Sequence, residues 1–156
     1  MSSGWEDGDY VGRPLRDLLA DVAGDDPVPA AGSTIAATTA LAAALTAKVA
    51  RRSRRDDAAE LAATADRLRA EIEPGITSDA AAYAQLLATP RTERDRDTAS
   101  AWPHAVRQVA EQVAALADEL AASGNPNLRY DAEAASHLAT AAGEVADRLV
   151  RANSAY

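Results

Sequence analysis

Apolar residues recur along this chain at spacings of three and four, and no segment sustains an alternation of apolar and polar positions. Spacings of three and four place apolar side chains on one face of an α-helix, whereas a half-buried strand alternates residue by residue. We therefore expect an all-α protein, a mostly antiparallel bundle of about five helices joined by short connections. The helices are predicted over residues 14–23, 33–54, 57–73 with a continuation to 87, 102–124 and 129–153.

Proline and glycine mark the predicted helix boundaries. Pro74-Gly75 interrupts the third helix, because proline removes a backbone donor and glycine favours turns. Residues 89–98 are charged and contain a proline, which predicts an exposed loop, and Pro103 then takes the favoured first turn of the next helix. Residues 1–12 are rich in serine, glycine and acidic residues and predict a loose lead-in. We expect a single domain over residues 13–156.

The composition predicts a core of small side chains. Hydrophobic residues make up 47% of the 156 residues, yet aromatic residues are only 4% and phenylalanine is absent. Alanine is the best helix former and puts no bulky side chain between two helices, so close helix packing is expected. A bundle so poor in large side chains needs extensive contact, which favours a homodimer that buries an alanine-rich face.

Charge and missing residue types argue against several classes of function. A net charge of −8 argues against nucleic-acid binding, which needs a broad basic face. Without cysteine there is no thiolate metal site, and the two histidines lie on different predicted helices without a metal-binding motif. The N-terminus is too polar for a signal peptide, and the longest apolar stretch, 35–47, is too short for a bilayer. We expect a cytoplasmic protein without metal, membrane or nucleic-acid partners.

The segment 27–33, with the sequence PVPAAGS, links two predicted helices and is the first candidate site. Its prolines end one helix, and its small residues open directly onto the next. Backbone N–H groups are free in the first turn of a helix, so such a start attracts negative charge and lets a ligand approach the main chain. The alternative is structural: Ser33 caps the helix and the prolines only terminate the preceding one.

Two acidic residues near predicted helix starts are candidates for chemistry. Asp79 follows the Pro74-Gly75 break, begins an apolar helical stretch and has Tyr83 one turn later. Asp131 lies in the first turn of the last predicted helix. For both residues the structural alternative is an acid that complements the helix dipole.

These segments together resemble the cyclodeaminase/cyclohydrolase family, which includes the C-terminal half of formiminotransferase-cyclodeaminase and the stand-alone methenyltetrahydrofolate cyclohydrolases. PVPAAGS at 27–33 is similar to the family's P-x-P-G-G-G-S, and SDAAAY at 78–83 is similar to its D-A-x-A-Y. Gly124-Asn125 and the following Arg129-Tyr130-Asp131 are similar to its G-N and S-D motifs. Asn153 stands at the second asparagine of its N-V-x-I-N. The four motifs occur in the family's order over most of the chain.

The chain departs from the family pattern at several positions. Ala30 and Ala31 replace two of the three glycines, and Leu149 replaces the first asparagine of the last motif. Thr77 stands where many members have a second aspartate, two residues before Asp79. These changes predict a narrower and more apolar pocket, and they leave open whether the family's working acid is retained.

The resemblance implies a dimeric enzyme of one-carbon folate metabolism that needs no metal or redox cofactor and takes a tetrahydrofolate derivative as substrate. Its reaction would open methenyltetrahydrofolate with water or close formiminotetrahydrofolate with loss of ammonia, with Asp79 as the proton-transfer group. The arginines between residues 51 and 55 would meet the substrate's glutamate tail or remain solvated at a helix end. We expect the substrate-binding residues to surround one cavity at one end of the bundle. They are Pro29, Gly32, Ser33, Tyr83, Asn125, Asp131 and Asn153.

Two other functions stay open on sequence alone. One is a relative that uses the pocket for another small molecule in a biosynthetic pathway, which Ala30, Ala31 and Leu149 favour. The other is a non-catalytic helical dimer that acts as an interaction module, which Thr77 favours.

Overall fold

The computed structural model describes residues 8–88 and 92–155, and every regular element among them is helical. Two short 3₁₀-helices, η2 (Tyr10–Gly12) and η3 (Pro126–Leu128), precede the first and the last α-helix. The predicted all-α fold is confirmed. The α-helices are α1 (Leu15–Val22), α2 (Ala31–Arg51), α3 (Ala58–Ile72), α4 (Gly75–Ala88), α5 (Glu93–Ser123) and α6 (Arg129–Ser154).

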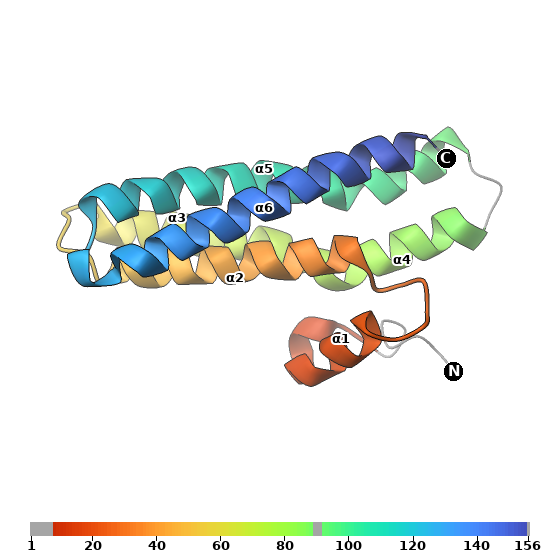
Figure 1. Ribbon diagram of the computed structural model, residues 1–156, viewed down its shortest axis with the longest axis horizontal. Helices are drawn as coiled ribbons and strands as arrows, with labels where there is room; N and C mark the ends of the chain where they lie inside the picture. Colours follow the sequence, from red (N-terminus) through yellow and green to blue (C-terminus); the bar gives the residue numbers. More distant parts are fainter. Residues whose placement is uncertain (1–7, 89–91, 156) are drawn as a thin grey trace.

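Helices α2 to α6 form an elongated bundle, and α1 lies beside it (Figure 1). The two longest helices, α5 and α6, run antiparallel and are joined at one end through η3. Helix α2 packs against α6, α3, α5 and α4, so it is the central helix of the bundle. The prediction counted residues 14–23 as the first of five helices and 57–87 as one interrupted helix. The structure places α1 beside the bundle and divides the interrupted helix at Pro74-Gly75 into α3 and α4, so the bundle itself consists of α2–α6.

Alanine forms the buried face of α6, as the composition predicts. Gly143 lies on the same contact with α5. A Cβ added to it would lie 3.5 Å from the Cβ of Ala110, which is van der Waals contact, so α5 comes close to α6 at this position. Small side chains let the two long helices approach, since the distance between helix axes depends on the residues at the contact. The buried alanines of α6 recur at spacings of three and four: Ala132, Ala135, Ala139, Ala142 and Ala146.

The start of α5 differs from the prediction of an exposed loop over 89–98. Residues 89–91 lie outside the described residues, but α5 already begins at Glu93. Thr92 caps it: its hydroxyl accepts the Asp95 N–H at 3.2 Å, and the Asp95 carboxylate accepts the Thr92 N–H at 3.0 Å. This reciprocal capping box starts a helix without any apolar residue, so the hydrophobic pattern did not reveal it. Pro103 consequently lies inside α5 and not at its start.

Of the loose lead-in expected for residues 1–12, residues 1–7 lie outside the described residues, and residues 10–12 form the short helix η2. Tyr10 is buried: its backbone N–H donates to the Thr77 hydroxyl at 3.0 Å, and its own hydroxyl donates to Asp21 at 2.6 Å. In contrast to Tyr10, most of the apolar face predicted for α1 is exposed to solvent. Leu18 is buried, whereas Leu15 and Leu19 are 64% and 60% exposed.

From the sequence, the longest apolar stretch, 35–47, was expected to be too short to cross a bilayer. The helix that contains it, α2, is longer than this stretch. By length and composition alone its 21 residues, with a mean hydropathy of 1.3 over the most apolar window, could cross a membrane. In the structure 61% of that window is buried inside the bundle, which is also the behaviour of a core helix.

Candidate functional site

The centre of the candidate site is the contact between Asp79 of α4 and Gly32 in the first turn of α2. A Cβ added to Gly32 would lie 1.8 Å from Oδ2, 2.3 Å from Cγ and 2.6 Å from Oδ1 of Asp79. No side chain fits at Gly32 while the carboxylate stays there, so the glycine makes room for the acid. Because the first turn of a helix carries a partial positive charge, this position suits a carboxylate.

Burial governs the chemistry of Asp79, which is only 6% exposed. Desolvation raises the pKa of this carboxyl from its ordinary value of 3.8 to about 6. The folded protein then holds the proton more tightly than the unfolded chain, so between about pH 4 and 6 stability falls as pH rises. With this pKa Asp79 is mostly ionised at neutral pH yet takes up a proton about one pH unit below it, which suits a group that exchanges protons with a substrate.

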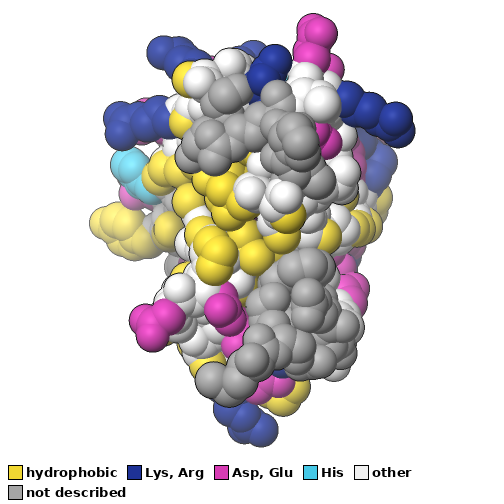
Figure 2. All heavy atoms as spheres, turned by 90° about the vertical axis from the view of Figure 1, so that its right-hand side faces the viewer, with side chains coloured by type: hydrophobic (Ala, Val, Ile, Leu, Met, Phe, Trp, Pro, Cys, Tyr) yellow, Lys and Arg dark blue, Asp and Glu magenta, His cyan; other side chains and the backbone are white. Residues whose placement is uncertain are grey.

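Asp79 opens into a cavity of about 210 Å³ at the end of the bundle where α2 begins and α6 ends. Figure 2 looks onto this end and shows hydrophobic side chains exposed in its middle. The polar side chains of the wall are Asp79, Tyr83 and Asn153. The other lining residues are Val28, Ala30, Ala31, Gly32, Pro103, Leu149 and Ala152.

Asn153 is oriented by an interruption in α5. Pro103 has no N–H, so the carbonyl of Ala99 four residues earlier lacks its usual partner within the helix. The Asn153 side chain, 5% exposed, donates Nδ2–H to that carbonyl at 3.1 Å. Its carbonyl oxygen Oδ1 accepts no hydrogen bond from the described residues and is left for an occupant of the cavity.

This orientation gives a stability prediction. Asn153→Asp keeps the shape but removes the donor and sets a carboxylate against the Ala99 carbonyl, so we expect the free energy of unfolding to fall by about 1–3 kcal/mol. Urea unfolding followed by circular dichroism measures it. Asn127→Asp, at an exposed position at the other end, is the matched control. Equal midpoints for the two variants would show that the Asn153 hydrogen bond contributes nothing.

The structure brings together four of the residues predicted to form the site: Gly32, Asp79, Tyr83 and Asn153 all line the cavity. Ala30, Ala31 and Leu149, which the sequence analysis expected to narrow the pocket, line it as well. Three further residues line the cavity. Val28 belongs to the candidate segment 27–33 but was not named as a binding residue, and Pro103 and Ala152 were missed. A proline inside a helical pattern was the available signal for Pro103, since it frees a carbonyl one turn earlier.

Pro29 and Ser33 are buried next to the site but do not line the cavity. The Ser33 side chain is fully buried, and its hydroxyl has no hydrogen-bond partner among the described residues. Ser33 is therefore not the cap of α2, which begins at Ala31 without a side-chain capping bond. The substrate-binding roles predicted for Pro29 and Ser33 stay predictions.

Asn125 and Asp131 lie at the other end of the bundle, so the expectation that one cavity within the chain unites them with Asp79 is wrong. Asn125 donates its side-chain N–H to the carbonyl of Arg52 at 2.8 Å, just beyond the last residue of α2, whereas Asp79 faces the first turn of α2. The 21 residues of α2 separate the two ends by about 30 Å. Asn125 also accepts the Asn127 N–H at 3.0 Å, so it closes the turn before α6.

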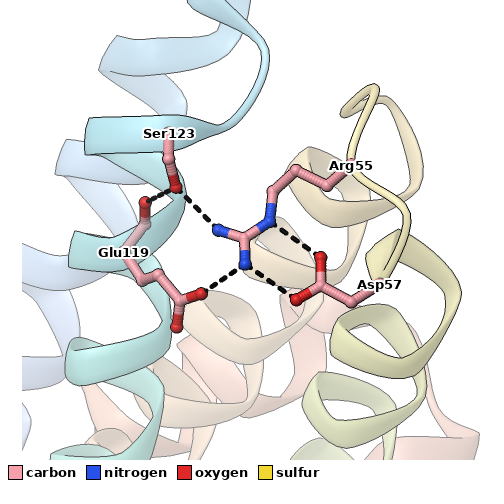
Figure 3. Close-up of polar contacts among 4 residues, drawn as sticks. All are labelled: Arg55, Asp57, Glu119 and Ser123. Atoms are coloured by element: carbon pink, nitrogen blue, oxygen red, sulfur yellow. Dashed lines mark hydrogen bonds and ion pairs between the residues drawn. The ribbon is translucent and has the colours of Figure 1, made fainter.

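The arginines between residues 51 and 55 belong to this far end, and Arg51 and Arg55 already have acidic partners. Arg55 reaches from the α2–α3 connection to both Asp57, at 2.7 Å, and Glu119 of α5, at 2.6 Å (Figure 3). The same guanidinium donates to the Ser123 hydroxyl at 2.6 Å (Figure 3). Arg51 pairs with Asp66 of α3. These contacts tie α2, α3 and α5 together, and within one chain they lie too far from Asp79 to meet the same small ligand.

The family model described as formiminotransferase-cyclodeaminase matches residues 14–156. The chain belongs to the formiminotransferase-cyclodeaminase family. Among solved structures, a formiminotetrahydrofolate cyclodeaminase from Thermotoga maritima is similar, with a TM-score of 0.84 and 24% identity over 92% of this chain and 80% of that one. At this identity the likeness establishes the fold. No curated protein sequence matches the chain.

Membership of the formiminotransferase-cyclodeaminase family confirms the resemblance drawn from the short motifs. Two of those motifs meet at the cavity, because Gly32 from the first and Asp79 from the second are in direct contact. The third motif, with Asn125, helps to close the opposite end of the bundle in this member of the family.

Proposed function

We infer that this protein is a folate one-carbon enzyme of the cyclohydrolase or cyclodeaminase type, with Asp79 as its proton-transfer group. The observation that carries the proposal is a carboxylate buried against a helix start at the edge of an apolar cavity, in a chain with the cyclodeaminase fold. We propose the cyclohydrolase reaction first, with cyclodeamination as its alternative.

The proposed reaction starts from a carbon held between two ring nitrogens that share a positive charge. As the oxygen of a water molecule bonds to that carbon, one proton of the water passes to the Asp79 carboxylate. The carbon becomes tetrahedral, and its bond to one nitrogen then breaks. That nitrogen takes the proton back from Asp79, and the second proton of the water leaves to solvent. Cyclodeamination would use the same tetrahedral carbon, with ammonia as the leaving group.

The other cavity residues have supporting roles in this proposal. The Asp79 carboxylate and the cationic carbon would attract each other more strongly inside this apolar cavity than in water, because the local dielectric constant is lower. Asn153, held by the Ala99 carbonyl, offers its Oδ1 to a substrate N–H. Tyr83 lies one turn after Asp79 on α4 and lines the same cavity.

An absorbance assay tests the proposal directly. Methenyltetrahydrofolate absorbs in the near ultraviolet and loses that absorption when its ring opens. We expect the purified protein to accelerate this loss above the rate in buffer. A progress curve identical to buffer across a range of protein concentrations would contradict a cyclohydrolase.

The pH dependence follows from the raised pKa of Asp79. As a general base Asp79 must be ionised, so kcat/KM should rise about tenfold per pH unit below a pKa of about 6 and level off above it. Initial rates between pH 5 and 8, corrected for the uncatalysed reaction, measure the profile. A profile that falls through pH 6 would mean that the protonated acid is the working form.

A second function is favoured by the lining of the cavity. Ala30, Ala31 and Leu149 take the place of glycines and an asparagine of the family pattern and make the wall apolar. Such a wall suits a different small molecule in a biosynthetic pathway. A thermal shift with a non-folate amidine or amine, without any turnover of methenyltetrahydrofolate, would support this function over the first.

We further propose that the protein acts as a homodimer that covers the open face of α1. Leu15 and Leu19 of α1 and Leu41 of α2 are each at least 60% exposed, an unusual concentration of large apolar side chains on a monomer surface. Light scattering should give twice the chain mass of 16.2 kDa, and Leu15→Glu with Leu19→Glu should lower it. A monomer mass at all concentrations would contradict the dimer.

A further inference from the structure

The beginning of α4, which carries Asp79, is held at three points. A Cβ added to Gly75 would lie 2.7 Å from Cε3 of Trp102, so α4 and α5 are in close contact there. Asp79 lies against Gly32 of α2. Between these two contacts, Thr77 is hydrogen-bonded to the N-terminal part of the chain. The position of the Asp79 carboxylate therefore depends on the N-terminal residues as well as on α2 and α5.

The Thr77 hydroxyl makes two hydrogen bonds to that part of the chain. It accepts the backbone N–H of Tyr10 at 3.0 Å and donates to Oδ1 of Asp9 at 2.8 Å. Tyr10 is only 4% exposed, so water has little access to its N–H group. A buried N–H without a partner costs more than the hydrogen bond itself contributes, so loss of the Thr77 hydroxyl would favour release of Tyr10 to solvent.

Residues 9–30 form an arm that joins Thr77 to the cavity. Its first residues are the partners of Thr77, and the Tyr10 hydroxyl donates to Asp21 at 2.6 Å, which ties η2 to α1. Of the eight residues of α1 only Leu18 is buried, so α1 itself adds little to the attachment. The arm then returns to the start of α2 (Figure 1), and its last residues line the cavity. The Thr77 hydrogen bonds therefore anchor a segment that ends in the wall of the site.

We propose that Thr77 is a positioning residue, which ties the arm to α4 and thereby keeps the Asp79 carboxylate against Gly32 and out of water. The proposal rests on the function inferred above, because it concerns the residue to which that function gives the proton transfer. Thr77 does not line the cavity, so it acts through the placement of the helix that carries the acid. Release of the arm would let the beginning of α4 move and water reach the carboxylate.

The pKa of the Asp79 carboxyl measures this placement without any substrate. Desolvation raises it to about 6 in the wild-type protein. Thr77→Val keeps the shape of the side chain and removes both hydrogen bonds, so this pKa should fall by about one unit as water reaches the carboxylate. The residues of α2, α5 and α6 that line the cavity carry no charge, and Tyr83 is the one titratable residue of the wall besides Asp79. Carbon-13 NMR titration of aspartate-labelled protein gives the value, with Asp79→Asn to assign the signal.

Asp9 allows a test that leaves α4 unchanged and separates position from charge. Asp9→Ala removes the acceptor of the Thr77 hydroxyl and should lower the Asp79 pKa, though by less than Thr77→Val, because the bond from the Tyr10 N–H remains. Asp9→Asn removes the charge but keeps an acceptor oxygen, so it should leave the Asp79 pKa unchanged. Equal lowering by the two variants would assign the shift to charge and overturn the proposal.

Two further threonine substitutions are the controls. Thr77→Ser keeps the hydroxyl and should keep the wild-type pKa of Asp79. Thr38→Val removes a half-buried hydroxyl that donates to the Thr34 carbonyl within α2 at 2.9 Å, and it should also leave that pKa unchanged. A wild-type pKa in Thr77→Val, or a pKa lowered equally in Thr77→Ser, would overturn the proposal. If Thr77→Val does not fold, Asp9→Ala decides, and an unchanged Asp79 pKa there overturns the proposal.

Kinetics separate this proposal from the proposed reaction. With methenyltetrahydrofolate, Thr77→Val should lower kcat about tenfold with little change in KM, since even a displacement of one ångström at a reacting group costs about 100-fold. Absence of turnover by the wild-type protein would refute the reaction, and the NMR titration would still decide the role of Thr77. Turnover by the wild type, together with a wild-type Asp79 pKa in Thr77→Val, would uphold the reaction and refute the positioning role.

Discussion

Asp79→Asn is expected to lower turnover of methenyltetrahydrofolate by about 100- to 10,000-fold, because it removes the proton-transfer group and keeps its shape. The same variant should be more stable than the wild type near neutrality. Burial of the ionised carboxylate, whose pKa is raised from 3.8 to about 6, costs at most about 3 kcal/mol at pH 7.5, and the neutral amide avoids that cost. We expect a gain of about 1–2 kcal/mol, since the amide itself must be desolvated.

The pH dependence of this stability gain is the sharpest part of the prediction. At about pH 4 the folded carboxyl is protonated and the unfolded one is about half protonated, so most of the gain should be lost there. Urea unfolding at pH 7.5 and pH 4 measures it, with Asp118→Asn as the matched control on the surface of α5. A variant with full activity, or a gain that does not change with pH, would show that Asp79 has neither the role nor the environment described.

Gly32→Ala is expected to have the second largest effect. Its Cβ would lie 1.8 Å from Oδ2 of Asp79, so the carboxylate must move by more than an ångström. A displacement of that size at a reacting group costs about 100-fold in rate. Overpacking should also lower the free energy of unfolding by about 1–3 kcal/mol. Steady-state kinetics and thermal unfolding measure the two effects.

A double-mutant cycle and a second glycine separate this contact from general helix effects. In an Asp79→Ala background the clash is gone, so Gly32→Ala should be neutral or stabilising there. Gly143→Ala in the middle of α6 meets the Ala110 Cβ at 3.5 Å and should stabilise by up to about 1 kcal/mol through helix propensity alone. A destabilisation by Gly32→Ala that persists without the Asp79 side chain would show that the contact is not its cause.

Periodicity predicted the helices well where apolar residues mark the buried face, as in α3 and α6. It failed at the start of α5, because Thr92 and Asp95 begin that helix through hydrogen bonds in a segment with no apolar residue before Ala99. It also overestimated the burial of α1. A regular apolar face shows that a helix is amphipathic, but it does not show that residues of the same chain bury that face.

Short motifs singled out Gly32, Asp79 and Asn153, which the structure places around one cavity. The structure also shows why the sequence could not predict the rest of the arrangement. Asp131 looks equivalent to Asp79, since both lie near a helix start. In an antiparallel bundle, however, neighbouring helices start at opposite ends, so α6 brings its last turn and not its first to the cavity. The clash distances at Gly32 and the Pro103–Ala99–Asn153 arrangement depend on tertiary contacts that no local pattern encodes.

The alanine face of α6 has a consequence for how this protein can change. The same three-and-four spacing that runs through Ala142 and Ala146 continues to Leu149 and Asn153, which line the cavity. Substitutions at these last positions alter what the cavity accepts, while the alanines that hold α5 and α6 together remain untouched. New ligand preferences can therefore arise by mutation at one end of a single helix, above all at Leu149, while the alanine contacts along the rest of that helix stay in place.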